Sequence, residues 1–115
     1  MDFNEFSDIN RRRCEAANGF NHKLSDWSLS DWITAITGEI GEAANVVKKL
    51  NRIRDGIPGN KETEPQLRQK LRQEFADVLI YLDLASQAAG FNLGNVVMEV
   101  FEAKSKQLGY VDAIC

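Results

Sequence analysis

The sequence contains few of the residues that form disulfides and soft-metal sites. Its 115 residues include two cysteines and one histidine. Cys14 and Cys115 are isolated and form no CxxC pair, so we expect two free thiols rather than a disulfide or a zinc site. His22 stands alone, whereas a di-iron helical bundle needs a Glu-x-x-His motif on each of two helices. Disulfide, zinc and di-iron chemistry are therefore not expected.

Long apolar runs and a broad basic surface are absent as well. No stretch of about 18 apolar residues suggests a membrane span. The N-terminus, MDFNEFSDINRRRC, lacks the hydrophobic segment of a signal peptide. The net charge is −3, and apart from Arg11, Arg12 and Arg13 the basic residues are dispersed. We therefore expect a cytoplasmic protein whose partner is neither a membrane nor a nucleic acid.

Helical periodicity dominates what the sequence does contain, and strand signals are almost absent. With 43% hydrophobic residues, a chain of this length is expected to form one domain, residues 1–115. Short connections between amphipathic segments predict an all-α fold, an antiparallel four-helix bundle. The predicted helices span residues 3–18, 30–54, 63–89 and 93–108, with an aromatic loop over 20–29 and a glycine- and proline-containing linker within 51–65.

Capping residues support these boundaries. Thr63, followed three residues later by Gln66, predicts a capping box at the start of the third helix. Ser30 and Asn92 are the predicted N-caps of the second and fourth helices, because their side-chain oxygens can accept a free amide of the first turn. Gly109 is expected to end the fourth helix.

Each long helix has an apolar stripe that we expect to form the core. Apolar residues that recur at intervals of four and three lie on one helical face. Val46, Ile80 and Leu84 fall outside these stripes and are expected to be buried against a second copy of the chain. The stripes consist of Ile36, Ile40, Ala43, Val47 and Leu50 in the second helix, Leu71, Phe75, Val78, Leu82, Ala85 and Ala89 in the third, and Val97, Val100, Phe101 and Leu108 in the fourth.

Two pairs of carboxylates lie beside the stripes of the second and third helices. Glu39-x-x-Glu42 and Glu74-x-x-Asp77 each place two acids on one helical face, and the linker makes the two helices antiparallel neighbours. Like charges this close raise a carboxylate pKa and need a counter-charge. Oxygen ligands without histidine or cysteine favour a hard cation, Mg²⁺ or Mn²⁺. The alternative is a set of solvated surface acids that pair with Lys48, Lys49, Lys70 and Arg72.

Longer segments of the chain resemble a known family. The runs ITGEIGEAANVVKK, LRQEFADVLIYLDLASQAAGFNL and VFEAKSKQLGY occur in this order over residues 30–110. They resemble the MazG-like all-α nucleoside triphosphate pyrophosphohydrolases, which carry ExxE and ExxD on two helices. Those enzymes bind Mg²⁺ through the four acids and cleave a nucleoside triphosphate to monophosphate and pyrophosphate. The resemblance implies that residues 30–110 are the catalytic helices, that residues 1–29 form a preceding helix and loop, and that the protein is a homodimer or homotetramer.

The resemblance also assigns roles to particular side chains. Tyr81 and Lys104 resemble a substrate-contacting tyrosine and a phosphate-contacting lysine of the dCTP pyrophosphatase branch, which makes dCTP the first choice of substrate. The gap between Glu42 and Glu74 is longer than is usual in the family, so the role of residues 51–65 stays open. The implied metal ligands and catalytic residues are Glu39, Glu42, Glu74 and Asp77.

A base-binding surface is predicted on the N-terminal side of the first carboxylate pair. Trp32 lies seven residues before Glu39, almost two helical turns and therefore on the same face, and the preceding loop holds Trp27 and His22. Aromatic rings at this place can stack a base, whereas the alternative is that both tryptophans are core anchors. Lys49, near the basic end of the same helix, is a candidate for steering phosphates.

Two functions other than general nucleotide house-cleaning stay open at this point. One is a phosphoribosyl-ATP pyrophosphatase-like enzyme of the same fold, whose pocket would be specific for a sugar phosphate. The other is a non-enzymatic helical module that uses its acidic face for regulation or assembly. The aromatic loop favours a nucleobase as the bound group.

Overall fold

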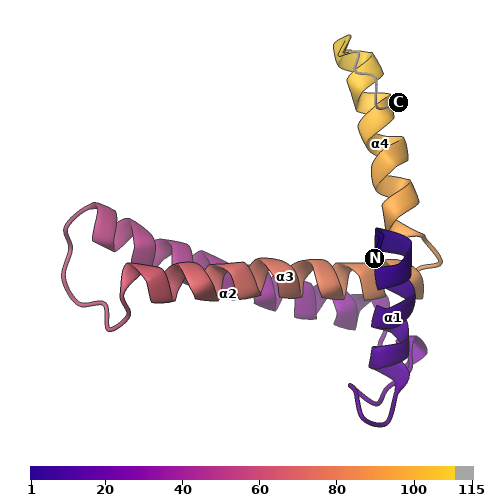
Figure 1. Ribbon diagram of the computed structural model, residues 1–115, viewed down its shortest axis with the longest axis horizontal. Coiled ribbons are helices and arrows are strands. Elements are labelled where there is room, and N and C mark those ends of the chain that lie inside the picture. Colours follow the sequence, from indigo (N-terminus) through magenta and orange to yellow (C-terminus); the bar gives the residue numbers. More distant parts are fainter. Residues whose placement is uncertain (111–115) are drawn as a thin grey trace.

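The fold is that of a computed structural model, which describes residues 1–110. No strand occurs among these residues, so the predicted all-α class is confirmed. The helices are α1 (Phe3–Glu15), the short 3₁₀ helix η1 (Leu24–Asp26), α2 (Leu29–Arg54), α3 (Glu64–Ala88) and α4 (Leu93–Leu108). Figure 1 shows α2 and α3 as a long antiparallel hairpin, with α1 crossing its open end and α4 leading away from that end.

The capping residues confirm two of the predicted helix starts and correct a third. Thr63 Oγ1 accepts the Gln66 amide at 3.3 Å, and the Asn92 side chain caps α4. Ser30, however, is not the N-cap of α2. Ser28 caps this helix, because its hydroxyl accepts the Asp31 amide while the Asp31 carboxylate accepts the Ser28 amide. This reciprocal capping box puts the N-cap two residues before the predicted one.

Helix α1 ends three residues before the predicted boundary because the following loop folds back on it. The amides of Phe20 and His22 donate to the carbonyls of Arg13 and Cys14 at 3.1 and 3.0 Å. These carbonyls of the last helical turn are therefore hydrogen-bonded without a further turn of helix. A side chain at Gly19 would place its Cβ 1.9 Å from the Arg13 carbonyl oxygen. Only glycine fits this return of the chain.

The buried stripe of the hairpin is rotated relative to the prediction. Ile40 and Val47 of α2 are 52% and 38% exposed, and Phe75 and Leu82 of α3 are 61% and 37% exposed, so these four core assignments are wrong. The inward positions of α2 follow the fully buried Trp32 at intervals of four and three, which brings Glu39 onto the inward face. The buried hydrophobic residues of the two helices are Trp32, Ile36, Ala43, Val46, Leu67, Leu84 and Ala85.

Two residues predicted to contact a second copy belong to the core of the chain instead. Leu84 is 0% exposed and Val46 is 8% exposed. Leu84 packs with Trp32 and Cys14 where α1 crosses the hairpin. The buried Cys14 is a free thiol, as predicted, whereas Cys115 lies outside the described residues.

A buried polar network joins α1 to α3. The Asp83 carboxyl group is 0% exposed and accepts hydrogen bonds from Ser7 Oγ at 2.8 Å, from Asn10 Nδ2 at 2.9 Å and from Gln87 Nε2 at 3.1 Å. Buried polar groups are tolerated when they are paired in this way. The network fixes α1, and with it the start of the aromatic loop, against the hairpin.

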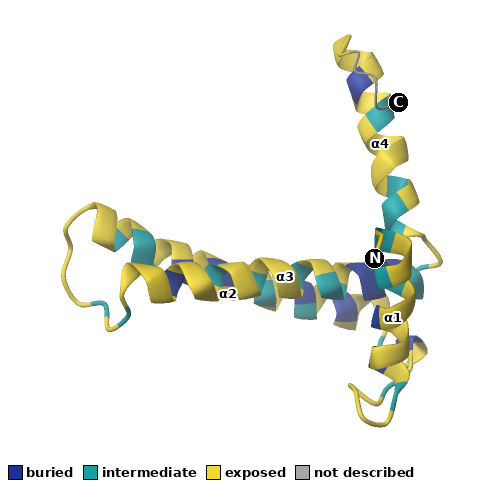
Figure 2. Ribbon diagram, in the orientation of Figure 1, coloured by how far each residue is buried: buried dark blue, intermediate teal, exposed yellow. Residues whose placement is uncertain are grey.

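Helix α4 makes little contact with the rest of the chain, and Figure 2 shows most of it exposed. Its predicted inward residues are therefore exposed in the single chain, from 52% for Val97 to 71% for Leu108. None of the helices within residues 1–110 is long and apolar enough to cross a membrane. The cytoplasmic location and the domain limits stay predictions.

Candidate active site

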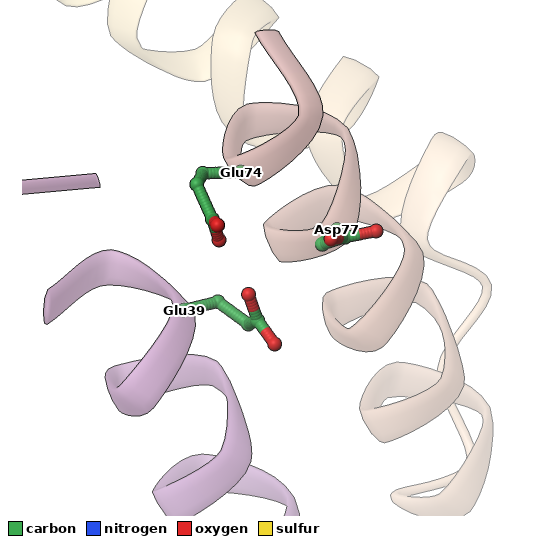
Figure 3. A group of neighbouring side chains, drawn as sticks. All are labelled: Glu39, Glu74 and Asp77. Carbon is green, nitrogen blue, oxygen red and sulfur yellow. The ribbon is translucent and has the colours of Figure 1, made fainter. Parts of the chain in front are cut away.

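Three carboxylates from the two hairpin helices converge at one point. Glu39 of α2 and Glu74 and Asp77 of α3 each offer an oxygen within 4.8 Å of the others. Figure 3 shows Glu39 and Glu74 pointing toward each other, with Asp77 about one turn farther along α3. Glu39 and Glu74 are half-buried and Asp77 is exposed. Glu42 is exposed and lies outside this group of three, although it interacts with Glu74.

The electrostatics of Glu74 show that the cluster lacks a counter-charge. A hydrogen bond shared with Glu39 raises the pKa of Glu74 above its ordinary value, and burial and the charges of Glu39 and Asp77 act in the same direction. Contact with Glu42 opposes this shift. Glu74 Oε2 is buried and has no hydrogen-bond partner among the described residues.

No basic side chain within residues 1–110 forms an ion pair with the four acids. Lys49 and Lys70, two of the four basic residues named in the surface-acid interpretation, both pair with Glu62 instead. A divalent cation fits the donor set, because such a cation binds carboxylate oxygens, and the unpaired Glu74 Oε2 could then serve as one of its ligands. The arrangement therefore suits a hard metal ion better than a set of solvated surface acids.

The aromatic residues predicted around the base form one cluster. The His22 ring stacks on Trp27 with centroids 4.9 Å apart, and Trp27 lies 4.5 Å from Trp32 and 6.5 Å from Tyr81. Trp32 is 0% exposed and donates its indole Nε1–H to the Leu24 carbonyl at 3.3 Å. It therefore has no surface on which a base could stack, and its place is that of a core anchor beneath Trp27.

Tyr81 links the aromatic cluster to the carboxylates. It lies one turn beyond Asp77 on α3, and the pKa of its hydroxyl is raised by burial and by the nearby charges of Glu39 and Asp77. The half-buried Trp27 is thus held beside the acidic cluster through Tyr81. The predicted closeness of rings and carboxylates is present in the fold.

Neither of the two lysines assigned to the substrate forms an ion pair with the carboxylates within residues 1–110. Lys104 is exposed on α4, where its Nζ donates to Gln107 Oε1 at 3.3 Å, and α4 leads away from the hairpin (Figure 1). One chain does not bring Lys104 to its own carboxylates. Lys49 donates to Glu62 Oε1 at 2.9 Å on the linker side of the site. Glu62 was missed by the sequence reasoning, because an acid in an irregular polar linker has no periodicity that places it.

Comparison with known families decides the classification. The family model for the MazG nucleotide pyrophosphohydrolase domain matches residues 28–107, more than half of the chain. The chain belongs to the MazG family. No curated protein and no solved structure matches it significantly. The matched MazG segment contains α2, α3, the three converging carboxylates and almost all of α4. It supports nucleotide pyrophosphohydrolase activity in general, of the divalent-metal-dependent kind, and leaves the particular nucleotide open.

Proposed function

We propose that this MazG domain is a Mg²⁺-dependent nucleoside triphosphate pyrophosphohydrolase that releases the monophosphate and pyrophosphate. The observation that carries the proposal is the convergence of three carboxylate oxygens within 4.8 Å, one residue of which has a buried oxygen without a partner. Glu39, Glu74 and Asp77 would hold the metal, with the neighbouring Glu42 as a further ligand. Mn²⁺, which also prefers oxygen ligands, is expected to substitute.

The four acids and the cation that they would bind have different roles in hydrolysis. A bound divalent cation supplies positive charge to the polyphosphate and lowers the pKa of a water molecule. The four acids would hold such a cation, and one of their carboxylates would accept the proton of the attacking water. Phosphoryl chemistry needs little else from the protein, because positioning and charge neutralisation supply most of the catalysis.

The base is proposed to stack on the exposed side of Trp27, next to His22. Trp27 and His22 are only half-buried, and Tyr81 places this pair beside the carboxylates. Stacking on an aromatic ring tolerates any base, so this contact gives affinity before selectivity. Among possible substrates dCTP is our first choice, in a house-cleaning role in the nucleotide pool. A phosphoribosyl-ATP-specific enzyme is less well supported, because the surface beside the acids is aromatic.

The working form is proposed to be a homodimer or homotetramer. A row of exposed apolar residues, Ile33, Ile40 and Val47, runs along α2 on the side of the buried stripe away from Glu42. Phase and exposure place Phe75 and Leu82 of α3 beside them. A second copy would cover this surface. It would also allow Lys104 of one chain to approach the carboxylates of another, which a single chain does not achieve.

A panel assay tests the proposed activity. Canonical and modified ribo- and deoxyribonucleoside triphosphates are incubated with the protein and Mg²⁺, and pyrophosphate and monophosphate are quantified. Release of both products from at least one nucleotide supports the proposal, whereas release of orthophosphate alone contradicts the cleavage position. A non-enzymatic module would show no release from any nucleotide. Millimolar Mg²⁺ should raise the midpoint of thermal unfolding of the enzyme, because a ligand that binds the native state stabilises the fold.

A further inference from the structure

The linker between α2 and α3 places one carboxylate over two lysines. Glu62 Oε1 accepts from Lys49 Nζ of α2 at 2.9 Å and from Lys70 Nζ of α3 at 3.4 Å. The hydrogen bond from Lys49, a backbone hydrogen bond and the contact with Lys70 lower the pKa of Glu62 to about 2, so this side chain is charged at neutral pH. The Glu62 side chain is 19% exposed, whereas those of Lys49 and Lys70 are 42% and 52% exposed.

The two lysines continue the row of functional residues along one face of the hairpin. Lys70 lies four residues before Glu74, and Lys49 lies seven residues after Glu42, so each shares a helical face with an acid of the cluster. The rise from Glu74 to Lys70 is about 6 Å. Because α2 and α3 are antiparallel, both lysines lie on the side of the cluster away from Trp32 and Tyr81.

This order matches the order of groups in a nucleotide. If the base lies at the aromatic cluster and the phosphates at the carboxylates, the end of the phosphate chain is directed toward Lys70 and Lys49. Ammonium groups bind phosphate as point charges. An open cavity of about 500 Å³ borders Glu62 and Lys70, and Lys49 is not among its lining residues.

The hydrogen bonding of the Glu62 carboxylate is incomplete, as expected for a side chain that a substrate phosphate displaces. Glu62 Oε2 and Arg52 Nε are both buried without a hydrogen-bond partner among residues 1–110. Unpaired buried polar groups reduce stability, so this arrangement is not the best available for a fixed structural clip. The linker has other anchors, since Arg52 Nη2 donates to the Pro58 carbonyl at 2.7 Å and Asn60 Nδ2 to the Lys49 carbonyl at 2.8 Å. Glu62 can therefore move while the linker stays in place.

We propose that Lys49 and Lys70 form the subsite for the terminal phosphates of the substrate, and that Glu62 occupies this subsite until a polyphosphate displaces it. The inference rests on the proposed function for the direction of the nucleotide. The long linker then has a role, because it carries Glu62. Glu62 competes for the lysines with anions that are too short to reach both the metal site and the lysines. Triphosphates are selected over single phosphates as a result.

Inorganic tripolyphosphate in the presence of Mg²⁺ is the probe, and its affinity is measured by calorimetric titration. Glu62→Gln should tighten binding by roughly threefold to tenfold, the range for one exposed charge–charge contact, and Lys70→Gln should weaken it by a similar factor. Glu64→Gln is the matched control, because it removes a nearby acid that pairs with the exposed Arg68 and with no lysine within residues 1–110, so it should leave affinity unchanged. In a Lys49→Gln, Lys70→Gln background the effect of Glu62→Gln should disappear.

Equal or weaker binding by a folded Glu62→Gln variant would overturn the inference and make Glu62 a structural clip. Circular dichroism establishes that the variant is folded, and Asn60 and Arg52 are left unchanged to anchor its linker. The two proposals fail separately. Tripolyphosphate binding with the predicted variant effects but no pyrophosphate release from any nucleotide would count against the function alone. Normal turnover with no effect of Glu62→Gln would count against the Glu62 subsite alone.

Discussion

The carboxylates of Glu39 on α2 and Glu74 on α3 point toward each other across the helical hairpin, with oxygens within 4.8 Å (Figure 3). Two like charges held this close by packing destabilise the chain when no cation is bound. The same closeness makes the pair a preformed ligand set. Function and stability are therefore in conflict at this place, and the conflict can be measured.

Replacing Glu74 by glutamine should stabilise the metal-free chain and abolish turnover. The substitution removes a charge that faces Glu39 and leaves a group that can donate a hydrogen bond to it. Turnover should fall by roughly 100-fold or more, since replacing even a residue that only hydrogen-bonds to a metal ligand lowers metal affinity or activity about 10–100-fold. Urea unfolding in EDTA and pyrophosphate release are the measurements. Glu99→Gln, an exposed acid on α4, is the charge control.

A Glu74→Gln chain that unfolds more easily in EDTA than the wild type would contradict the repulsion. Glu42→Gln provides a graded comparison. Glu42 is exposed and outside the group of three, so its replacement should reduce turnover while changing metal-free stability less than Glu74→Gln does.

The stability of the metal-free protein should decrease with rising pH because of Glu74. The pKa of this residue is raised in the folded chain above its value of 4.5, so between these two values the folded state holds more of the proton than the unfolded state. Stability from this group is full below pH 4.5 and is lost as the pH rises through the folded pKa. The unfolding midpoint in EDTA, followed upward from pH 4.5, should show this loss in the wild type and not in Glu74→Gln. Identical pH profiles for the two proteins would remove Glu74 as the cause.

The two tryptophans should differ when each is replaced by alanine. Trp27→Ala should weaken nucleotide binding about tenfold, within the range of roughly 1 to 3 kcal/mol per stacked base, and leave Mg²⁺ binding nearly unchanged. Trp32→Ala should instead destabilise the fold by roughly 3 to 5 kcal/mol, because it empties a fully buried site. Nucleotide titration and denaturant unfolding separate these effects. An unchanged KM in a folded Trp27→Ala variant would place the base elsewhere.

The polar network at Asp83 should be needed for the docking of α1. Asp83→Ala leaves the donors of Ser7, Asn10 and Gln87 without their shared acceptor, at a cost of roughly 2 to 3 kcal/mol. Hydrogen exchange should then rise in α1 and in the aromatic loop before it rises in the centre of α3. Uniform loss of protection across the chain would show that α1 and the hairpin unfold together.

The sequence predicted those features that depend on local periodicity. The bounds of α4, the caps Thr63 and Asn92 and the meeting of Glu39 with Glu74 follow from helical spacing and an antiparallel turn. The side of each helix that faces inward was predicted less well. Ile40 and Phe75 are exposed because the fully buried Trp32 of α2 packs with Leu84 of α3 and sets the rotation of the hairpin, and an isolated helix pattern does not contain this contact.

Features that depend on irregular segments or on a second chain could not be predicted from the sequence. The contact of Glu62 with Lys49 and Lys70 results from the path of the linker, and no spacing rule predicts it. Trp32 and Trp27 have the same chemistry, and only the packing of the loop makes one a core residue and leaves the other accessible. The distance of Lys104 from the carboxylates follows from the direction of α4.

The central claim is that the acids of α2 and α3 make this chain a metal-dependent pyrophosphohydrolase. The most direct test measures pyrophosphate release from nucleoside triphosphates by the wild type and by Asp77→Asn across a Mg²⁺ titration. Asp77 is exposed, so its replacement should leave the fold intact. We predict release by the wild type that rises with Mg²⁺ and stops in EDTA, and little or no release by Asp77→Asn. Equal release by the two proteins, or release that persists in EDTA, would contradict the account.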